Sequence, residues 1–166
     1  MSPPPKERIA VIGAGMMGQA CSQAFAMAGY EVRLQSIDDE LFQGVRDRIR
    51  HDLAFLAERG LGSAREVDGA VARIKTTTEL AEAVDGADVV LECIFENLEA
   101  KRSLFRQMEA LVGPEVILAT NTSVIRISEI AEACSLPGRV VGAHWWTTSC
   151  TSPTSSMPSW GSLPSA

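Results

Sequence analysis

A loop of closely spaced glycines near the amino terminus constrains this chain more than any other feature. The sequence V-I-G-A-G-M-M-G includes the end of a short apolar run, 8–12, and leads into a stretch rich in small residues, 19–28. The apolar run is rich in β-branched residues, as in a buried parallel strand, and the small residues favour a helix that Gly29 ends. The pattern therefore predicts a strand, a glycine turn and a helix in immediate succession.

Each glycine in this loop has its own reason to lack a side chain. Gly13 permits the tight turn, Gly15 lets a ligand approach the backbone, and Gly18 lets the helix pack against the strand. The free N–H groups and the positive dipole end of the helix would then bind phosphate. We therefore expect a dinucleotide site lined by Gly13, Gly15, Met16, Met17 and Gly18. The alternative is a simple glycine-rich turn, or a sheet that binds another adenine-containing ligand.

Strands and helices alternate along the rest of the chain. Apolar runs predict further strands at 31–37, 73–77, 88–93, 116–120 and 139–144, and other patterns predict helices at 38–59, 64–71, 79–84, 98–112 and 127–134. The alternation predicts an α/β fold with a doubly wound parallel sheet of the Rossmann type. The charged helix 38–59 and the shorter helix 64–71 would project from the sheet as a helical hairpin, with His51 on its surface.

Composition narrows the partners that such a chain could have. The net charge of -6 argues against a nucleic-acid binder, which usually has a basic stripe. No apolar run reaches the roughly 20 residues of a membrane span, and the proline-rich residues 1–6 do not resemble a signal peptide. The cysteines are too far apart for a metal-binding C-x-x-C pair; they are Cys21, Cys93, Cys134 and Cys150. We therefore expect no metal site, and thiols kept in a reducing cytoplasm.

The composition changes sharply after residue 146. Residues 147–166 contain no charged side chain, consist mostly of Ser, Thr and Pro, and have no helical or strand period. Such a segment cannot bury enough apolar surface to offset the entropy lost on ordering. We therefore expect a dinucleotide-binding domain over residues 1–146 and a disordered tail over residues 147–166.

The end of the second predicted strand bears on which dinucleotide is bound. Folds of this type often place an acidic residue there, where it binds the ribose hydroxyls. Ser36 stands at that position, Asp38 lies two residues further on, and no arginine follows directly to favour a 2′-phosphate. We therefore expect NAD rather than NADP, with Ser36 and Asp38 near the ribose. The alternative role for Asp38 is to cap the following helix.

Polar residues suited to catalysis follow the later strands. Glu96 and Lys101 come after the fourth predicted strand, Asn121 and Ser123 after the fifth, and His144 at the end of the sixth. All of them would lie at the carboxyl ends of strands, which is the edge where open α/β sheets bind ligands. These residues therefore form the candidate catalytic and cofactor-binding set.

Taken together, these motifs resemble the 3-hydroxyacyl-CoA dehydrogenase family. The resemblance covers residues 7–146 and rests on V-I-G-A-G-M-M-G, D-V-V-L-E-C-I-F-E-N-L-E-A-K, A-T-N-T-S and V-G-A-H-W-W, in this order. The predicted hairpin also resembles the helical insertion of that family. The resemblance implies an NAD-dependent oxidoreductase of fatty acid metabolism (β-oxidation) that acts on an acyl-CoA or a related 3-hydroxy acid. A hydride would pass between C3 of the substrate and NAD.

The resemblance also implies a role for each candidate residue. Ser123 would bond the substrate's hydroxyl or keto oxygen beside the cofactor, and His144 would be the general base that removes the hydroxyl proton. Glu96 and Lys101 would contact the cofactor, and Asn121 would shape the loop near the nicotinamide. Without the resemblance, His144 could be a strand-end histidine beside two tryptophans, and Ser123 a cap or turn former. Glu96 and Lys101 could likewise be a solvated surface pair.

The sequence departs from the family pattern after His144. The family continues with Asn-Pro and a strand whose glutamate orients the imidazole, whereas Thr147 and Ser156 stand at those positions here. The family also has a second, helical domain that forms its dimer, and we expect that domain to be absent from a truncated or frame-shifted chain. Cofactor binding with little or no turnover is therefore expected. The alternatives are a non-catalytic NAD(H)-binding module or, with a poorer match, another Rossmann enzyme such as a methyltransferase.

Overall fold

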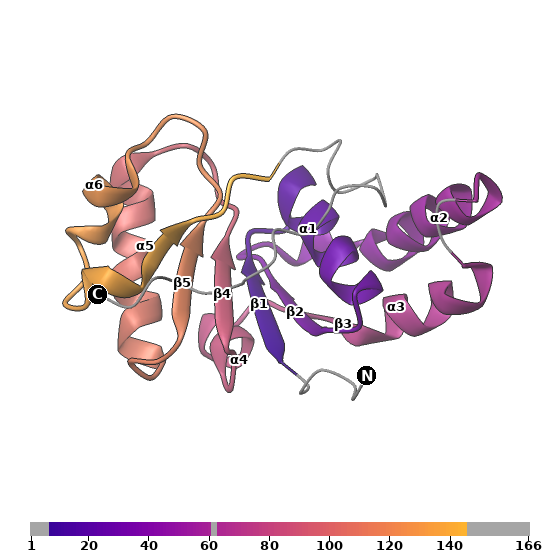
Figure 1. Ribbon diagram of the computed structural model, residues 1–166, viewed down its shortest axis with the longest axis horizontal. Coiled ribbons are helices and arrows are strands. Elements are labelled where there is room, and N and C mark those ends of the chain that lie inside the picture. The colour runs from indigo at the N-terminus through magenta and orange to yellow at the C-terminus, as the bar shows by residue number, and fades with distance from the viewer. Residues whose placement is uncertain (1–6, 61–62, 146–166) are drawn as a thin grey trace.

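Parallel strands form the centre of the fold, in the order β3-β2-β1-β4-β5-β6 (Figure 1). A computed structural model describes residues 7–60 and 63–145. The strands are β1 (Arg8–Ile12), β2 (Glu31–Gln35), β3 (Ile74–Thr77), β4 (Val89–Glu92), β5 (Ile117–Thr120) and β6 (Val140–Gly142). The expected tail, with Thr147 and Ser156, lies outside the described residues.

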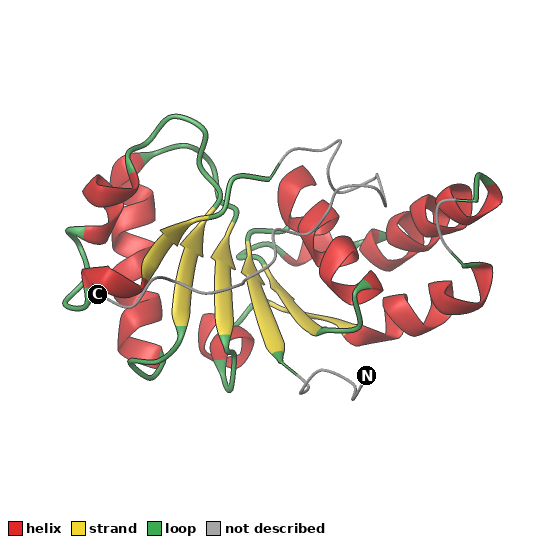
Figure 2. Cartoon of the chain, in the orientation of Figure 1, coloured by secondary structure: helices red, strands yellow, loops and turns green. Residues whose placement is uncertain are grey.

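Helices pack on both faces of the sheet (Figure 2). They are α1 (Met16–Met27), α2 (Val45–Glu58), α3 (Val67–Arg73), α4 (Leu80–Val84), α5 (Leu98–Leu111) and α6 (Ile127–Ala131), with 3-10 turns at Asp39–Phe42, Ala64–Glu66 and Pro137–Arg139. Helices α1, α2 and α3 share one apolar core with the sheet, and α4, α5 and α6 share the other. The expected doubly wound parallel sheet of the Rossmann type is therefore confirmed.

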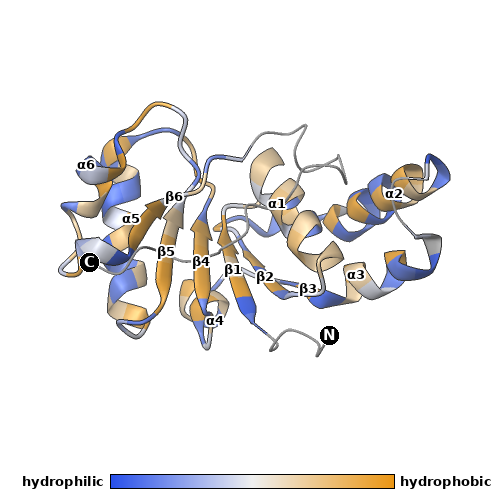
Figure 3. Ribbon diagram, viewed as in Figure 1, coloured by the Kyte–Doolittle hydropathy of each residue, from blue (hydrophilic) through white to orange (hydrophobic). Residues whose placement is uncertain are grey.

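The sequences of β1, β4 and β5 suit burial on both faces of the sheet. Their residues are mostly hydrophobic (Figure 3), and the side chains of β1 alternate between the two apolar cores. Val11 packs toward α1, and its neighbours Ala10 and Ile12 pack toward α4 and α5. Strands buried on both faces lose the polar–apolar alternation of surface strands, as the continuous apolar runs predicted.

The helical hairpin is present but begins later than expected. Helices α2 and α3 pack against each other and extend beyond the β3 edge of the sheet (Figure 1). The single helix expected over 38–59 is wrong, because Gly44 adopts a left-handed conformation with φ of 69° and separates the 3-10 turn from α2. Glycine reaches this conformation without steric cost and so interrupts an otherwise helical pattern. None of the helices in the described part is long and apolar enough to cross a membrane.

Three smaller differences affect the residues of the candidate site. Helix α1 begins at Met16 rather than at residue 19, so Gly18 lies within its first turn. Strand β2 ends at Gln35 and β6 ends at Gly142, which leaves Ser36 and His144 in the segments that follow. The expected strands were therefore too long at the edge where the sheet meets its loops.

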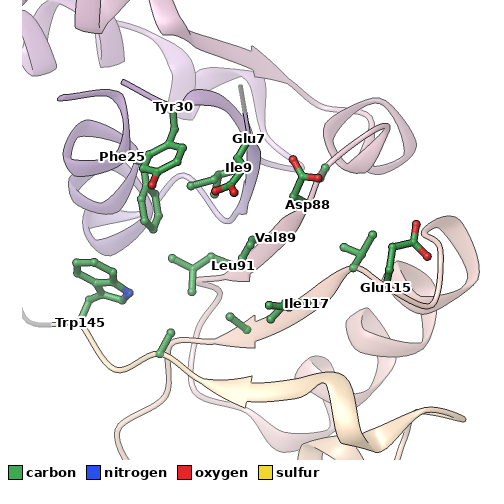
Figure 4. Close-up of a pocket in the computed structure, with 14 residues that line it drawn as sticks. Glu7, Ile9, Phe25, Tyr30, Asp88, Val89, Leu91, Glu115, Ile117 and Trp145 are labelled. Carbon is green, nitrogen blue, oxygen red and sulfur yellow. The ribbon is translucent and has the colours of Figure 1, made fainter. Parts of the chain in front are cut away.

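An apolar groove lies on the α1 side of the sheet (Figure 4). It has a volume of about 510 Å³, and Ile9, Leu91 and Ala119 contribute to its apolar lining. Trp145 stands at one end, packed edge-to-face on Phe25 with the ring centroids 5.5 Å apart. The groove is separate from the candidate residues, because neither the glycine loop nor Ser123 or His144 lines it.

Candidate cofactor and catalytic site

The glycine loop joins β1 to α1 at the point where the strand order reverses. Strand β1 lies between β2 and β4, so its carboxyl end opens into the crevice between the two halves of the sheet. The N–H of Gly13 donates to the carbonyl of Gln35 at 2.8 Å, and the N–H of Cys93 donates to the carbonyl of Ile12 at 2.7 Å. The loop is therefore fixed to the ends of both neighbouring strands.

The three glycines differ in what surrounds them. A Cβ on Gly13, whose φ is 108°, would lie 2.7 Å from the carbonyl oxygen of Cys93, and one on Gly18 would lie 1.7 Å from that of Gly13. A Cβ on Gly15 would meet nothing within 4 Å. Gly13 and Gly18 are thus required by the fold itself, whereas Gly15 faces open space that a bound group can enter.

The first turn of α1 suits an anion. Gly15 is its N-cap and provides no side-chain acceptor, and the first turn contains no acidic residue. Met16 is exposed, Met17 is half-buried, and the N-terminal N–H groups and dipole of this helix favour negative charge. The loop therefore fits the pyrophosphate of a dinucleotide by both shape and charge.

The end of β2 lies beside this loop. Ser36 is buried, and its hydroxyl accepts a hydrogen bond from the N–H of Asp38 at 3.3 Å. Asp38 is exposed and caps the following 3-10 turn, with its carboxylate accepting from the N–H of Glu40 at 2.8 Å. Asp38 therefore has the capping contact that the sequence offered as its alternative role, and its carboxylate remains at the surface.

Ser123 and His144 meet at the carboxyl edge of the sheet. The hydroxyl Oγ of Ser123 lies 2.9 Å from Nε2 of His144, and both residues are exposed. Ser123 follows β5 and His144 follows β6, so pairing of these neighbouring strands in register brings the two together. A hydroxyl hydrogen-bonded to an imidazole can bind a substrate oxygen and pass on one proton.

Asn121 fixes the backbone next to His144. Its side-chain oxygen accepts a hydrogen bond from the N–H of Trp145 at 2.9 Å, and its own N–H donates to the carbonyl of Glu92 at 2.8 Å. The N–H of Ala143 donates to the carbonyl of Thr120 at 2.9 Å. The segment containing His144 is therefore held on both sides by the end of β5.

Glu96 holds the loop that presents Ser123. One carboxylate oxygen accepts from the N–H of Ser123 at 2.7 Å, and the other accepts from the hydroxyl of Thr122 at 2.9 Å. Burial raises the pKa of Glu96, but these two hydrogen bonds and the charge of Lys101 outweigh it, so the pKa lies below its usual value. Glu96 is therefore ionised near neutral pH and holds the loop that contains Thr122 and Ser123.

Lys101 lies beneath this surface rather than on it. Its side chain has no exposed area, and its ammonium lies 2.6 Å from Glu92 and 3.7 Å from Glu96. Asn97 caps α5 by accepting from the N–H of Ala100 at 2.9 Å, which places Lys101 in the first turn of the helix. The solvated surface pair that the sequence offered as an alternative for Glu96 and Lys101 is therefore wrong.

Glu92 and Thr120 belong to this site although the sequence analysis did not single them out. They are register partners on β4 and β5, both are buried, and the hydroxyl of Thr120 donates to Glu92 at 2.7 Å. Burial raises the pKa of Glu92, against the opposing hydrogen bonds and charge of Lys101. The sequence does contain one signal for this cluster, because Glu92 is a charged residue inside a strand that is otherwise expected to be buried. A buried charge needs a partner of opposite charge or a hydrogen-bond donor.

Comparison with known proteins agrees with this geometry. The sequence profile of the family described as "3-hydroxyacyl-CoA dehydrogenase, NAD binding domain" matches residues 8–155. A probable 3-hydroxybutyryl-CoA dehydrogenase of Bacillus subtilis is 38% identical over 139 residues, which is 84% of this chain and 48% of that protein. A crystal structure of 3-hydroxybutyryl-CoA dehydrogenase from Escherichia coli K12 superposes with a TM-score of 0.81 at 33% identity, covering 90% of this chain and 31% of that one.

A second solved structure gives the same relation. The (S)-3-hydroxybutyryl-CoA dehydrogenase of Ralstonia eutropha superposes with a TM-score of 0.80 at 30% identity, covering 86% of this chain and 50% of that one. The chain thus spans about half the length of the Bacillus and Ralstonia proteins. The part that they share contains the glycine loop, whose open face at Gly15 fits NAD. The chain therefore belongs to the 3-hydroxyacyl-CoA dehydrogenase family and contains its NAD-binding domain, for which NAD is the cofactor.

Proposed function

We propose that this chain binds NAD(H) at the carboxyl edge of its sheet and takes part in oxidation or reduction at C3 of an acyl-CoA or related 3-hydroxy acid. The main support is the 2.9 Å contact between Ser123 and His144 at the same edge as the glycine loop. The relatives named above act on 3-hydroxybutyryl-CoA according to their names, which favours a short 3-hydroxyacyl thioester.

The proposed cofactor contacts follow the edge of the sheet from β2 to β5. The pyrophosphate would lie on the N-terminus of α1, against the open face of Gly15 and the backbone of Met16 and Met17. Ser36 and Asp38 would lie near the adenine ribose. The family resemblance implies cofactor contacts for Glu96, Lys101 and Ser123 and places Asn121 near the nicotinamide. Because Lys101 is buried, Glu96 is the one of the Glu96–Lys101 pair whose side chain is exposed toward a cofactor. When bound, NAD supplies the hydride acceptor.

The proposed chemistry needs one proton to move. The hydroxyl of Ser123 would bond the oxygen on C3 of the substrate and hold it beside Nε2 of His144. His144 would take the hydroxyl proton as the carbonyl forms, and would return it when the reaction runs backwards. The two groups thus have separate roles, since Ser123 orients the oxygen and His144 moves the proton.

His144→Gln tests whether the pair is catalytic. We expect this variant to bind NADH as the unaltered chain does. Its rate of NAD-dependent oxidation of 3-hydroxybutyryl-CoA should be at least about a hundredfold lower, which is within the range of effects seen when a general base is removed. Initial rates from NADH absorbance, with binding measured in parallel, check this. Equal oxidation rates in the two proteins, both above a control without protein, would exclude His144 as the base.

A non-catalytic NAD(H)-binding module is the second candidate. Its support is in the sequence, which has Ser156 where the family has the glutamate that orients the imidazole. In that case the unaltered chain binds NADH but shows no oxidation above a control without protein. Dimerisation, cytoplasmic localisation and low activity of this chain alone stay predictions.

Ser36→Asp tests the ribose side of the site. A carboxylate at the end of β2 can bond both ribose hydroxyls, whereas the buried Ser36 hydroxyl already accepts from the N–H of Asp38. We expect NADH to bind about tenfold more tightly to the variant, and NADPH to bind more weakly because the new charge repels its 2′-phosphate. Fluorescence titrations with both nucleotides check this, and unchanged NADH affinity would place the ribose elsewhere.

A further inference from the structure

Three buried polar side chains lie directly beneath the proposed site. The side chains of Glu92 and Lys101 have no exposed area, and Thr120, which pairs with Glu92 across β4 and β5, is completely buried. The carboxylate of Glu92 accepts from Nζ of Lys101 at 2.6 Å, from the hydroxyl of Thr120 at 2.7 Å and from the N–H of Ile94 at 2.7 Å. This cluster ties β4, β5 and the start of α5 together at one point.

Stability alone gives a poor account of this cluster. The free energy lost when two charged groups leave water is about as large as the free energy gained from their attraction. A buried ion pair therefore rarely stabilises a fold more than apolar residues of the same volume would. The surroundings are apolar, since Ile12 pairs with Glu92 in register and Leu118 and Phe105 belong to the same core. Apolar side chains at these positions would therefore stabilise the sheet at least as well. We infer that the charged residues have a role other than stability.

The contacts of Lys101 point to that explanation. Its ammonium lies 3.7 Å from Glu96, whose carboxylate also accepts hydrogen bonds from the loop that contains Thr122 and Ser123. Glu96 accepts from the N–H of Ser123 and from Thr122, and the hydroxyl of Thr122 also accepts from the N–H of Ile125 at 3.1 Å. A continuous series of hydrogen bonds and charge contacts therefore leads from the buried cluster to the residue that pairs with His144.

We propose that Glu92 and Thr120 are positioning residues: they hold the ammonium of Lys101 against Glu96, which in turn fixes the backbone N–H of Ser123 and so the Ser123–His144 pair. The proposal rests on the proposed function of that pair. Glu92 accepts a hydrogen bond from the buried ammonium of Lys101, and the hydroxyl of Thr120 holds the other oxygen of that carboxylate in place. Loss of the cluster would then loosen the loop at Ser123 while the sheet remains folded.

The experiment compares hydrogen exchange at individual amides. The double variant Glu92→Gln/Lys101→Met removes both charges together, so no buried charge is left unpaired. We expect the amide of Ser123 to exchange about tenfold faster in this variant, because its acceptor Glu96 has lost its cation. The amide of Ala143, bound to the carbonyl of Thr120, is the internal control and should keep its rate. Equal exchange at Ser123 in the folded double variant and the unaltered chain overturns the proposal.

A milder pair of variants answers the question if the double variant fails to fold. Thr120→Val keeps the volume of the side chain but removes its hydrogen bond to Glu92, whereas Thr120→Ser keeps the hydroxyl. We expect faster exchange at Ser123 in Thr120→Val and rates near those of the unaltered chain in Thr120→Ser. Identical exchange in the two variants overturns the proposal. The unaltered chain is titrated with NADH in parallel. Absence of binding would count against the proposed function, whereas the exchange rates at Ser123 test the positioning role separately.

Discussion

Replacing Gly18 by alanine is expected to destabilise this protein more than any other single change at the glycine loop. The new methyl group would lie 1.7 Å from the backbone oxygen of Gly13, in the first turn of α1, where neither partner is a flexible side chain. Helix α1 and the loop would have to move apart, and α1 supplies Cys21 and Ala26 to the apolar core. We expect the free energy of unfolding to fall by more than about 3 kcal/mol.

Urea unfolding followed by circular dichroism checks this prediction. Gly138→Ala is the matched control, because a Cβ at Gly138 meets nothing within 4 Å. The control should unfold within about 0.5 kcal/mol of the unaltered chain. If Gly18→Ala were as stable as Gly138→Ala, the close packing of α1 on the β1 loop would be wrong.

Lys101→Met is expected to have the second large effect. The substitution leaves the carboxylate of Glu92 buried without its cation, and breaking a buried ion pair in this way costs about 3–5 kcal/mol. Lys75→Met, at an exposed position on β3, is the matched control for loss of a lysine and should be nearly neutral. Denaturant unfolding of both variants measures the difference, and equal stability would show that Glu92 and Lys101 are not buried together.

The stability lost in Lys101→Met should depend on pH in a defined direction. Burial already raises the pKa of Glu92 above its ordinary value, and removing Lys101 removes two of the contributions that lower it. A carboxyl group whose pKa is raised on folding contributes stability below its unfolded pKa and loses it as the pH rises through the folded value. The deficit of Lys101→Met against the unaltered chain should therefore shrink on acidification below neutral pH, as Glu92 becomes protonated. A deficit that grows on acidification would contradict this.

The sequence predicted the fold because its signals are local. Each strand is a short apolar run between turn residues, and alternation with helices leaves few arrangements besides a doubly wound sheet. The errors are at element ends, since β2 ends at Gln35 and β6 at Gly142, each two residues before the end that the sequence predicted. The interruption at Gly44 was visible as a glycine inside a helical pattern, but a glycine is also tolerated within a helix, so the pattern did not indicate its left-handed conformation.

The part of the candidate site that follows from the strand order could be predicted from the sequence. Ser123 and His144 follow neighbouring parallel strands, so their meeting at one edge follows from the order of the sheet. The cluster of Glu92 and Lys101 was not predictable in the same way. Its members are nine positions apart across a loop and a helix start, and the sequence pattern suggests a solvated lysine. Both side chains are buried because of the way α5 packs on β4 and β5. This packing is a tertiary feature, and no local sequence pattern predicts it.

Titration of NADH into the purified chain, followed by its fluorescence and repeated with NADPH, tests whether the glycine loop binds a dinucleotide. We expect saturable binding of NADH, with NADPH binding more weakly. We also expect Gly15→Ala to fold as Gly138→Ala does but to lose NADH binding, because the methyl group occupies the open space that the pyrophosphate needs. Absence of NADH binding to the folded chain, or equal binding to Gly15→Ala, would contradict binding at this loop.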